Sequence, residues 1–247
     1  MKKEYILECC VDTIEAAQNA IAGGAGRIEL CGNLIIGGTT PSPVLCEIIL
    51  NRSDIPVRAM IRPRFGDFLY TDGEFEIMRR ETALFRDMGC EGVVFGILTA
   101  DGKLDKKRMA ILREEARGMK VTLHRAFDLA IDPFDALETA REIGIDTILT
   151  AGQRQTALEG KESLRDLAKA SWDIEIMAGS SVDAHAIREL KSFTGISSYH
   201  LSGRVQTDSP MIYRKHGINM GLASISEYQR WECSIEKVAA ARAAMEG

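Results

Sequence analysis

Short β-branched runs alternate with amphipathic helical patterns along almost the whole chain, and this alternation constrains the fold more than any other feature. The runs begin at intervals of roughly 20 to 35 residues, about the length of one strand–helix unit. Eight runs are predicted as strands: Tyr5–Cys10, Arg27–Cys31, Val57–Ile61, Gly92–Ile97, Val121–His124, Thr147–Thr150, Ile174–Met177 and Tyr199–Ser202. Amphipathic segments between them are predicted as helices: Ile14–Ala22, Glu74–Met88, Lys106–Arg117, Phe134–Ile143, Ser163–Ala170 and Ala184–Phe193.

Strict alternation of strand and helix implies parallel strands joined by right-handed crossovers. The chain has 247 residues, close to the typical length of one (β/α)8 barrel. The rival architecture, an open doubly wound sheet, usually has a glycine-rich phosphate turn after its first strand. Here Cys10-Val11-Asp12-Thr13 follows that strand, and the glycines of 23–26 precede a strand, as at a helix end. We therefore predict an α/β fold: a single TIM barrel of parallel strands over residues 1–247, with a long loop after Arg204 and a final helix over Ile235–Met245.

Composition excludes several classes of protein. Hydrophobic residues make up 45% of the chain and charged residues 27%, as in average globular proteins. No apolar stretch approaches the roughly 20 residues of a membrane span, and no signal peptide is recognisable. The net charge of −5, without any basic run, argues against a nucleic-acid partner. Six cysteines in a chain of this length indicate reduced thiols, so we expect a soluble cytoplasmic protein.

Ionisable side chains gather at the carboxyl ends of the predicted strands. Barrel strands are buried on both faces, so a charge within them is costly unless it is paired or used. Active sites of TIM barrels lie at this end of the strands. We therefore expect an acid–base pocket for a small polar or anionic substrate, with these catalytic residues: Glu8, Glu29, Arg62, His124 and Asp128.

These residue types suit proton transfer and anion binding. Neighbouring carboxylates such as Glu8 and Glu29 push their pKa values apart and can exchange a proton. His124 is a natural proton shuttle near neutral pH, and Arg62 can hold a carboxylate or phosphate with two hydrogen bonds. The structural alternative is an internal salt-bridge network that only compensates its own burial. Charge contributed by several strands at one end favours the pocket.

Further polar residues near the strand ends are expected to bind the substrate: Arg64, Arg125, Thr150 and His200. Barrels often bind phosphate after strands seven and eight. Here Ser180-Ser181 and Gly203-Arg204 occupy those places, so a phosphorylated substrate is one option, while ordinary turn chemistry explains the same residues.

Two thiols allow a different interpretation of the same end of the barrel. Cys10 and Cys31 end the first two predicted strands, and neighbouring strands lie about 4.7–4.9 Å apart. Two soft sulfurs without harder ligands suit Cu(I) better than Zn(II). The alternative is that both cysteines are small buried hydrophobic residues.

Many short segments, in order along the whole chain, resemble the CutC copper homeostasis family. The N-terminal ones are Glu8-x-Cys10-Val11-Asp12, Gly24-Ala25-Gly26-Arg27-Ile28-Glu29-Leu30-Cys31 and Gly37-Gly38-Thr39-Thr40-Pro41-Ser42. The others are Met60-Ile61-Arg62-Pro63-Arg64, Gly66-Asp67-Phe68-x-Tyr70, Val94-Phe95-Gly96, His124-Arg125-Ala126-Phe127-Asp128, Leu149-Thr150-Ala151-Gly152, Met220-Gly221 and Glu227-Tyr228.

This resemblance implies a TIM barrel, a cytoplasmic location, a homodimer or higher homo-oligomer, and a role in copper homeostasis. It also implies Cu(I) binding at Cys10 and Cys31, with no organic cofactor. The chain departs from the family pattern at Ala178-Gly179-Ser180-Ser181, Thr150-Ala151-Gly152 and Leu201-Ser202-Gly203, which weakens the case for a phosphate subsite.

Two functions remain in competition, with a third and weaker one behind them. The first is a copper-handling protein whose two thiolates hold Cu(I). The second is an enzyme with an acid–base pocket whose link to copper is indirect, since two thiols alone leave Arg62, Arg64, His124 and Asp128 without a role. The third is an oligomeric scaffold with a vestigial pocket.

Overall fold

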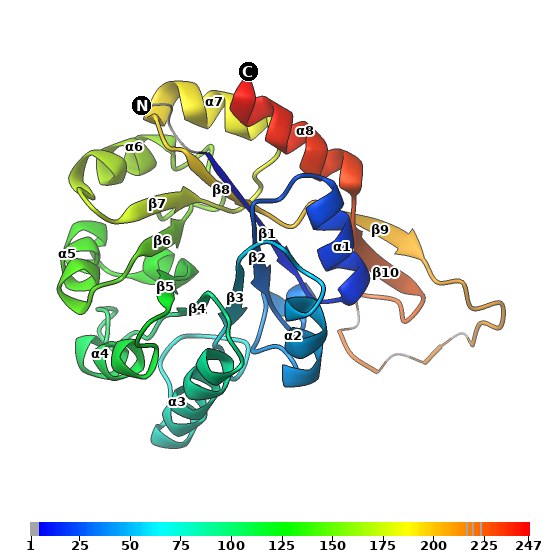
Figure 1. The fold of residues 1–247 in the computed structure, drawn as a ribbon, viewed down its shortest axis with the longest axis horizontal. Helices are drawn as coiled ribbons and strands as arrows, with labels where there is room; N and C mark the ends of the chain where they lie inside the picture. The colour runs from blue at the N-terminus through cyan, green and yellow to red at the C-terminus, as the bar shows by residue number, and fades with distance from the viewer. Residues whose placement is uncertain (1–4, 216, 219, 223) are drawn as a thin grey trace.

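The computed structural model describes residues 5–215, 217–218, 220–222 and 224–247. Eight parallel strands close into a barrel in the order β1 to β8, with helices around it (Figure 1). The predicted (β/α)8 TIM barrel is therefore confirmed. The strands are β1 (Ile6–Val11), β2 (Arg27–Leu30), β3 (Val57–Met60), β4 (Gly92–Phe95), β5 (Lys120–Leu123), β6 (Thr147–Thr150), β7 (Glu175–Ala178) and β8 (Ser198–Leu201).

The α-helices are α1 (Ile14–Ala22), α2 (Pro43–Leu50), α3 (Asp72–Asp87), α4 (Lys106–Glu115), α5 (Pro133–Ile143), α6 (Lys161–Ala170), α7 (Ala184–Thr194) and α8 (Ile235–Glu246). Two short 3₁₀ helices, η1 (Leu34–Ile36) and η2 (Arg125–Leu129), lie in the loops after β2 and β5. Side-chain caps fix where several α-helices begin. Thr71 and Glu74, for example, form a reciprocal capping box at the start of α3.

Alternation along each strand divides the interior into two regions. Leu7, Cys9 and Val11 of β1 belong to the large apolar core between strands and helices. Cys10 faces the opposite way and packs in a small cluster inside the barrel with Cys31, Met60 and Val94. Glu8 pairs in register with His200 of β8, and Cys10 pairs with Glu29 of β2. The register therefore brings residues from three neighbouring strands together within the lumen.

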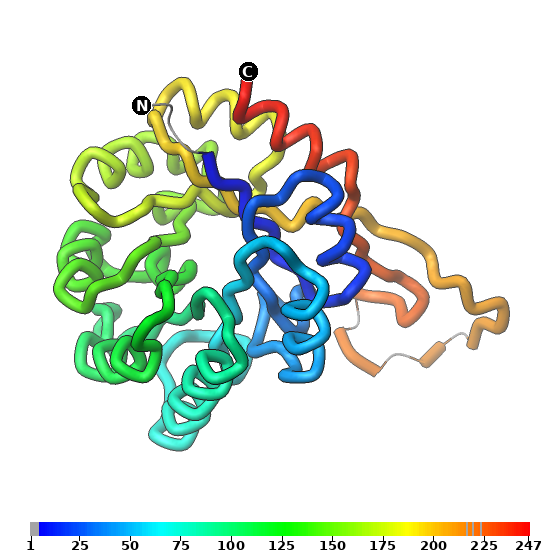
Figure 2. Tube along the Cα trace, viewed as in Figure 1, coloured from blue at the N-terminus to red at the C-terminus, as the bar shows by residue number. Residues whose placement is uncertain are grey.

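The segment after β8 differs from the expected long loop. Arg204–Asp208 (β9) and Gln229–Cys233 (β10) form an antiparallel pair outside the barrel, beside α1 (Figure 2). Asn19 of α1 donates to the carbonyl of Cys233 at 3.0 Å, which fastens this pair to the barrel. The prediction missed the pair because about twenty residues separate its strands, so no tight-turn signal links them.

The other unexpected element is α2. Its sequence, PVLCEIIL, is apolar nearly all round and lacks the polar stripe by which a surface helix is recognised. At the far end of the chain, α8 packs on α7 (Figure 2). Arg242 of α8 donates to the carbonyl of Tyr5. None of the helices in the described ranges is long and apolar enough to cross a membrane.

Candidate functional site at the barrel mouth

A cavity of about 590 Å³ opens at the carboxyl ends of the strands. Seven of the residues predicted for the site line it: Cys10, Glu29, Arg62, His124, Arg125, Asp128 and His200. Four do not line it: Glu8, Cys31, Arg64 and Thr150. Glu8, Cys31 and Thr150 lie within the barrel wall beside lining residues, whereas Arg64 lies in the loop after β3.

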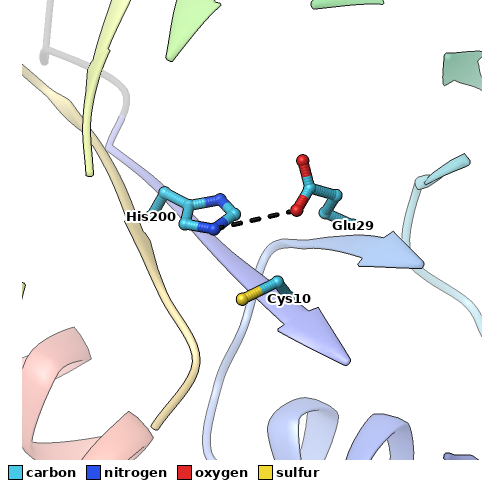
Figure 3. Close-up of side chains that lie close together, drawn as sticks. All are labelled: Cys10, Glu29 and His200. Atoms are coloured by element: carbon cyan, nitrogen blue, oxygen red, sulfur yellow. Dashed lines mark ion pairs between the residues drawn. The ribbon is translucent and has the colours of Figure 1, made fainter. Parts of the chain in front are cut away.

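Three potential metal ligands converge on one side of the cavity (Figure 3). The Sγ of Cys10, a carboxylate oxygen of Glu29 and a ring nitrogen of His200 all lie within 4.8 Å of one another. They come from β1, β2 and β8, which are neighbours in the closed sheet. A thiolate, an imidazole and a carboxylate form a donor set that suits a transition metal.

Glu8 fixes the orientation of His200 from below. Its Oε1 lies 2.8 Å from Nδ1 of His200, which leaves Nε2 facing Glu29 at 3.8 Å. Burial opposes the charge of Glu8, but Arg27 and His200 outweigh it and bring the pKa of Glu8 down to about 2. Burial likewise opposes protonation of His200, yet Cys10, Glu29 and Glu8 raise the pKa of His200 well above its usual value. The pair is therefore an ionised carboxylate holding an imidazolium.

Glu29 occupies a different electrostatic environment. Burial is the main cause that raises its pKa above the usual value of a glutamate. Its Oε2 accepts a hydrogen bond from the Sγ of Cys31 at 3.5 Å, while Oε1 is buried without a partner in the described structure. Burial and the nearby Glu29 raise the pKa of the Cys31 thiol well above its usual value. The pKa values of Glu8 and Glu29 are thus shifted in opposite directions, that of Glu8 downwards by Arg27 and His200 and that of Glu29 upwards by burial.

His124 is held as a neutral ring on another wall of the cavity. It caps η2, and its Nδ1 accepts a hydrogen bond from the backbone N–H of Ala126 at 3.2 Å. Burial, together with Arg62, lowers the pKa of His124 to about 3. A neutral ring whose Nδ1 accepts must carry its proton on Nε2. That Nε2 is buried and has no partner among the described residues.

Arg62 lies beside His124, and both contact the ring of Phe68. The Arg62 guanidinium carbon is 5.0 Å from that ring centroid, and the imidazole centroid is 4.8 Å from it. The terminal nitrogens of Arg62 donate to the carbonyls of Gly37, Gly38 and Gly66. Within the described ranges, no carboxylate forms a salt bridge with Arg62, and its buried Nε has no partner.

Asp128 and its neighbours form a clamp around the loop after β6. The Asp128 carboxylate accepts from the hydroxyl of Thr150, the backbone N–H groups of Ala151 and Gln153, and the side chain of Arg125. These donors occupy both oxygens, so the structure gives Asp128 a positioning task. Arg64 turns away from the cavity and pairs with Asp67 and Glu74 instead.

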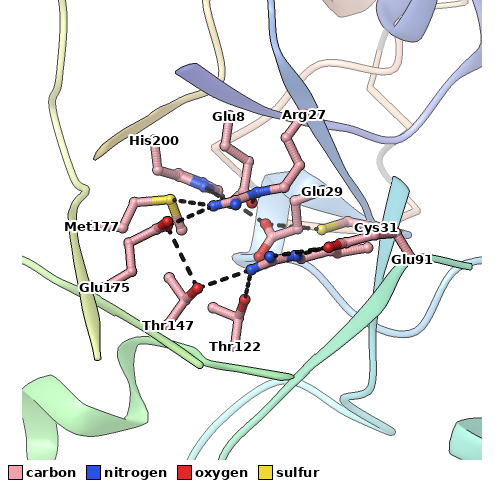
Figure 4. A network of polar contacts seen from close by, with 11 residues as sticks. Glu8, Arg27, Glu29, Cys31, Glu91, Thr122, Thr147, Glu175, Met177 and His200 are labelled. Atoms are coloured by element: carbon pink, nitrogen blue, oxygen red, sulfur yellow. Dashed lines mark hydrogen bonds and ion pairs between the residues drawn. The ribbon is translucent and has the colours of Figure 1, made fainter. Parts of the chain in front are cut away.

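Beneath the cavity lies a polar layer that the sequence analysis missed (Figure 4). Arg27 bridges Glu8 at 2.5 Å and Glu175 at 3.0 Å. Arg58 donates to the hydroxyls of Thr122 and Thr147 and pairs with Glu91 at 2.8 Å. The sequence did contain a signal for this layer. Side chains two residues apart lie on the same face of a strand, so Arg27 lies on the same face of β2 as Glu29 and could have been predicted to point into the barrel.

Comparison with known proteins points in one direction. The model of the CutC family matches residues 5–205. A CutC family protein from Vibrio vulnificus strain YJ016 is 44% identical over 227 residues, covering 91% of each chain. A copper homeostasis protein cutC homolog from Mus musculus is 41% identical over 236 residues, covering 95% of this chain and 87% of the relative.

Solved structures agree with the sequence comparison. The crystal structure of a CutC copper homeostasis protein from Streptococcus agalactiae superposes with a TM-score of 0.77 at 28% identity, covering 81% of this chain and 99% of that one. The N-(5'-phosphoribosyl)anthranilate isomerase of Pyrococcus furiosus superposes with a TM-score of 0.57 at 13% identity, covering 98% of this chain and 99% of that one. The second likeness shows a shared barrel fold only.

Proposed function

This chain belongs to the CutC family, and we propose that its part in copper homeostasis is to hold Cu(I) at the mouth of the barrel. The observation that carries the proposal is the convergence of Cys10, Glu29 and His200 within 4.8 Å. Thiolate and imidazole are both ligands that suit copper. Glu8 supports the same site, since a carboxylate on the second ring nitrogen commonly orients a metal-binding histidine.

Cys10 is the central ligand of the proposed site because it lines the cavity and reaches the other two donors. Cys31 packs in the same small cluster as Cys10, but it is fully buried and hydrogen-bonded to Glu29. We assign Cys31 the role of a second thiolate that joins when the metal displaces its proton. Cu(I) is the cargo, and the two thiols supply soft ligands at the wall of the open cavity.

An anaerobic Cu(I) titration against a chromogenic chelator tests this proposal. We expect about one tightly bound Cu(I) per chain, with tight binding lost in the double variant Cys10→Ser, Cys31→Ser. The matched control is Cys46→Ser with Cys90→Ser, since these two thiols touch each other at 3.4 Å outside the cavity. Unchanged affinity in the Cys10/Cys31 variant, or equal loss in the control, would contradict the proposal.

A second candidate function, acid–base catalysis on a small polar or anionic substrate, rests on a separate observation. The cavity is far larger than one ion requires, and His124 and Arg62 line it with unpaired polar atoms. A screen of phosphorylated sugars, keto acids and lactones tests this function. Turnover that disappears in His124→Ala and Glu29→Gln, but persists in Arg64→Gln, supports it. Absence of turnover across the whole panel speaks against it.

Two further proposals concern the cellular location and the oligomeric state of the protein. We propose a cytoplasmic location and a homodimer or higher homo-oligomer, on the ground of family membership. Light scattering on the purified chain tests the second, with a mass of at least twice 27.2 kDa as the expected result. A mass of one chain at micromolar concentration would refute it.

A further inference from the structure

The cavity contains a buried cation without a counter-charge. The guanidinium of Arg62 is always ionised, and Arg62 is only 8% exposed. Its three hydrogen bonds all go to neutral backbone carbonyls. Among the residues that the structure describes, no acidic side chain lies within ion-pair distance of it. Burying a charge without a counter-charge is costly, so a bound anion would offset the desolvation of Arg62.

His124 adds a second donor next to this cation. Both side chains contact Phe68, which places them on the same wall. The hydrogen bond from Ala126 occupies Nδ1 and fixes the ring so that Nε2 carries the hydrogen. Gly96 holds the ring in place, because a Cβ there would lie 2.8 Å from Cε1 and Nδ1. An oxygen anion is the ligand that a fixed N–H beside a guanidinium binds best.

Glu29 supplies the opposite polarity in the same cavity. Its Oε1 is buried and unpartnered, while its Oε2 is engaged by Cys31. Buried polar groups in native proteins nearly always have partners, and an unmade bond costs about 1–3 kcal/mol. Three residues that line the cavity therefore each have a buried polar atom without a partner among the described residues: two donors, Nε of Arg62 and Nε2 of His124, and one acceptor, Oε1 of Glu29.

We propose that this cavity is a binding site for a small hydroxycarboxylate. Its carboxylate accepts hydrogen bonds from Arg62 and His124, and its hydroxyl donates to Oε1 of Glu29. An inorganic anion without a proton, such as chloride or sulfate, satisfies the first pair but leaves Glu29 unpartnered, and a neutral sugar leaves Arg62 without a counter-charge. The inference rests on the second candidate function and names its class of substrate.

Binding to copper-free protein, followed by NMR of the His124 side chain, tests the proposal. The probes are two hydroxy acids and their deoxy counterparts, which differ by one hydroxyl group: lactate with propionate, and glycolate with acetate. We expect a saturable shift of the His124 Nε2–H signal with at least one hydroxy acid. The deoxy partner should bind about tenfold more weakly, the loss expected for one hydrogen bond to a buried polar group.

Variants separate the site from nonspecific charge. His124→Phe should weaken binding about tenfold or more, while Arg64→Gln should leave it unchanged, because Arg64 lies outside the cavity and is paired with Glu74. Arg62 also ties three loop carbonyls together, so Arg62→Lys is the mildest change there, and His124→Phe provides the independent result should that variant misfold. No saturable shift with either hydroxy acid, or equal binding of both members of each pair, overturns the inference.

The outcome of this experiment can be distinguished from the outcomes that test the other two proposals. It measures binding rather than turnover, so hydroxy acids that fail to bind while another compound is converted would remove the substrate class and keep the catalytic function. Binding of hydroxy acids without turnover of any compound would keep the ligand class and remove the catalytic function. Copper affinity does not enter either result, because the protein is free of metal.

Discussion

A single backbone hydrogen bond decides the chemistry of His124. The N–H of Ala126 occupies Nδ1 at 3.2 Å, and burial with Arg62 lowers the pKa of the ring to about 3. The sequence pointed to a proton shuttle that titrates near neutral pH. The structure shows instead a permanently neutral donor, which suits polarisation of an oxygen rather than uptake of a proton.

This neutral state links His124 to acid stability. The unfolded chain protonates His124 below about pH 6.5, whereas the folded chain resists protonation until about pH 3. The stabilising contribution is therefore present above pH 6.5 and is lost as the pH falls. Between pH 7 and pH 5, we expect His124 alone to remove about 2 kcal/mol from the free energy of unfolding.

Urea unfolding of the wild type and of His124→Gln at both pH values measures that loss. The variant should lose about 2 kcal/mol less than the wild type between the two pH values, since glutamine does not titrate. Glu8 does not contribute in this range, because its lowered pKa matters only below its ordinary value of 4.5. Identical losses in both proteins would show that the ring takes up its proton over the same pH range in the folded protein as in the unfolded chain.

Sequence reasoning at this scale identified residue types but not their pairings. Charges at strand ends were visible because buried strands seldom contain them, and seven predicted residues do line one cavity. The partners were not visible. Asp128 binds the segment that follows β6, and Arg64 pairs with Glu74 of α3. The conformation of the loops, which the strand pattern does not predict, places both side chains. Likewise, no pattern showed that Cys10 would meet His200 from the last strand.

At the scale of elements, β4 and β5 together position His124. Gly96 follows β4 directly, and the His124 ring after β5 packs against its Cα, where a side chain has no room. The structural reason for glycine here is close approach, since an added Cβ would also lie 2.8 Å from Cδ1 of Leu123. The residue that follows β4, Gly96, thus determines where the side chain of His124 after β5 can lie.

Gly96→Ala should therefore act on both stability and the site. We expect a loss of about 1–3 kcal/mol from overpacking, with a displaced ring and a weaker Ala126–His124 hydrogen bond. Chemical denaturation measures the first effect, and the imidazole NMR signals report the second. Gly73→Ala in α3 is the control, because its added Cβ would lie 3.9 Å from the Thr71 hydroxyl. Equal behaviour of the two variants would show that the ring adapts without cost.

Element prediction succeeded where periodicity was clear and failed where packing overrode it. All eight barrel strands were expected at nearly their observed positions because parallel buried strands are short, β-branched runs. The helix α2 was missed since its residues are apolar on every side. The pair β9–β10 was missed because its pairing is non-local, which no short window of sequence can show.

Across the whole molecule, the barrel interior consists of two polar layers that follow one another along the barrel axis. The lower layer is a polar network, centred on Arg27 and Arg58, that joins β1, β2, β3, β5, β6 and β7. The upper layer holds the cavity. Glu8 belongs to both, because it pairs with Arg27 below and with His200 above. The charge state of the proposed metal site therefore depends on an ion pair deeper in the barrel.

Replacing Arg27 should consequently destabilise the fold and also change the proposed metal site above it. Arg27→Met leaves Glu8 as a buried charge with one partner fewer, and we expect a loss of about 3–5 kcal/mol in the free energy of unfolding. Adding Glu8→Gln should restore part of this loss, because the stranded charge disappears. Arg79→Met is the matched control: Arg79 pairs with Glu115 at 2.7 Å but is 41% exposed, so its removal should lower the free energy of unfolding far less than that of Arg27. Urea unfolding of the four proteins decides between a burial effect and simple loss of an ion pair. Similar losses in Arg27→Met and Arg79→Met would mean that the deep layer is hydrated, and the coupling between Glu8 and the upper site would then have no electrostatic basis.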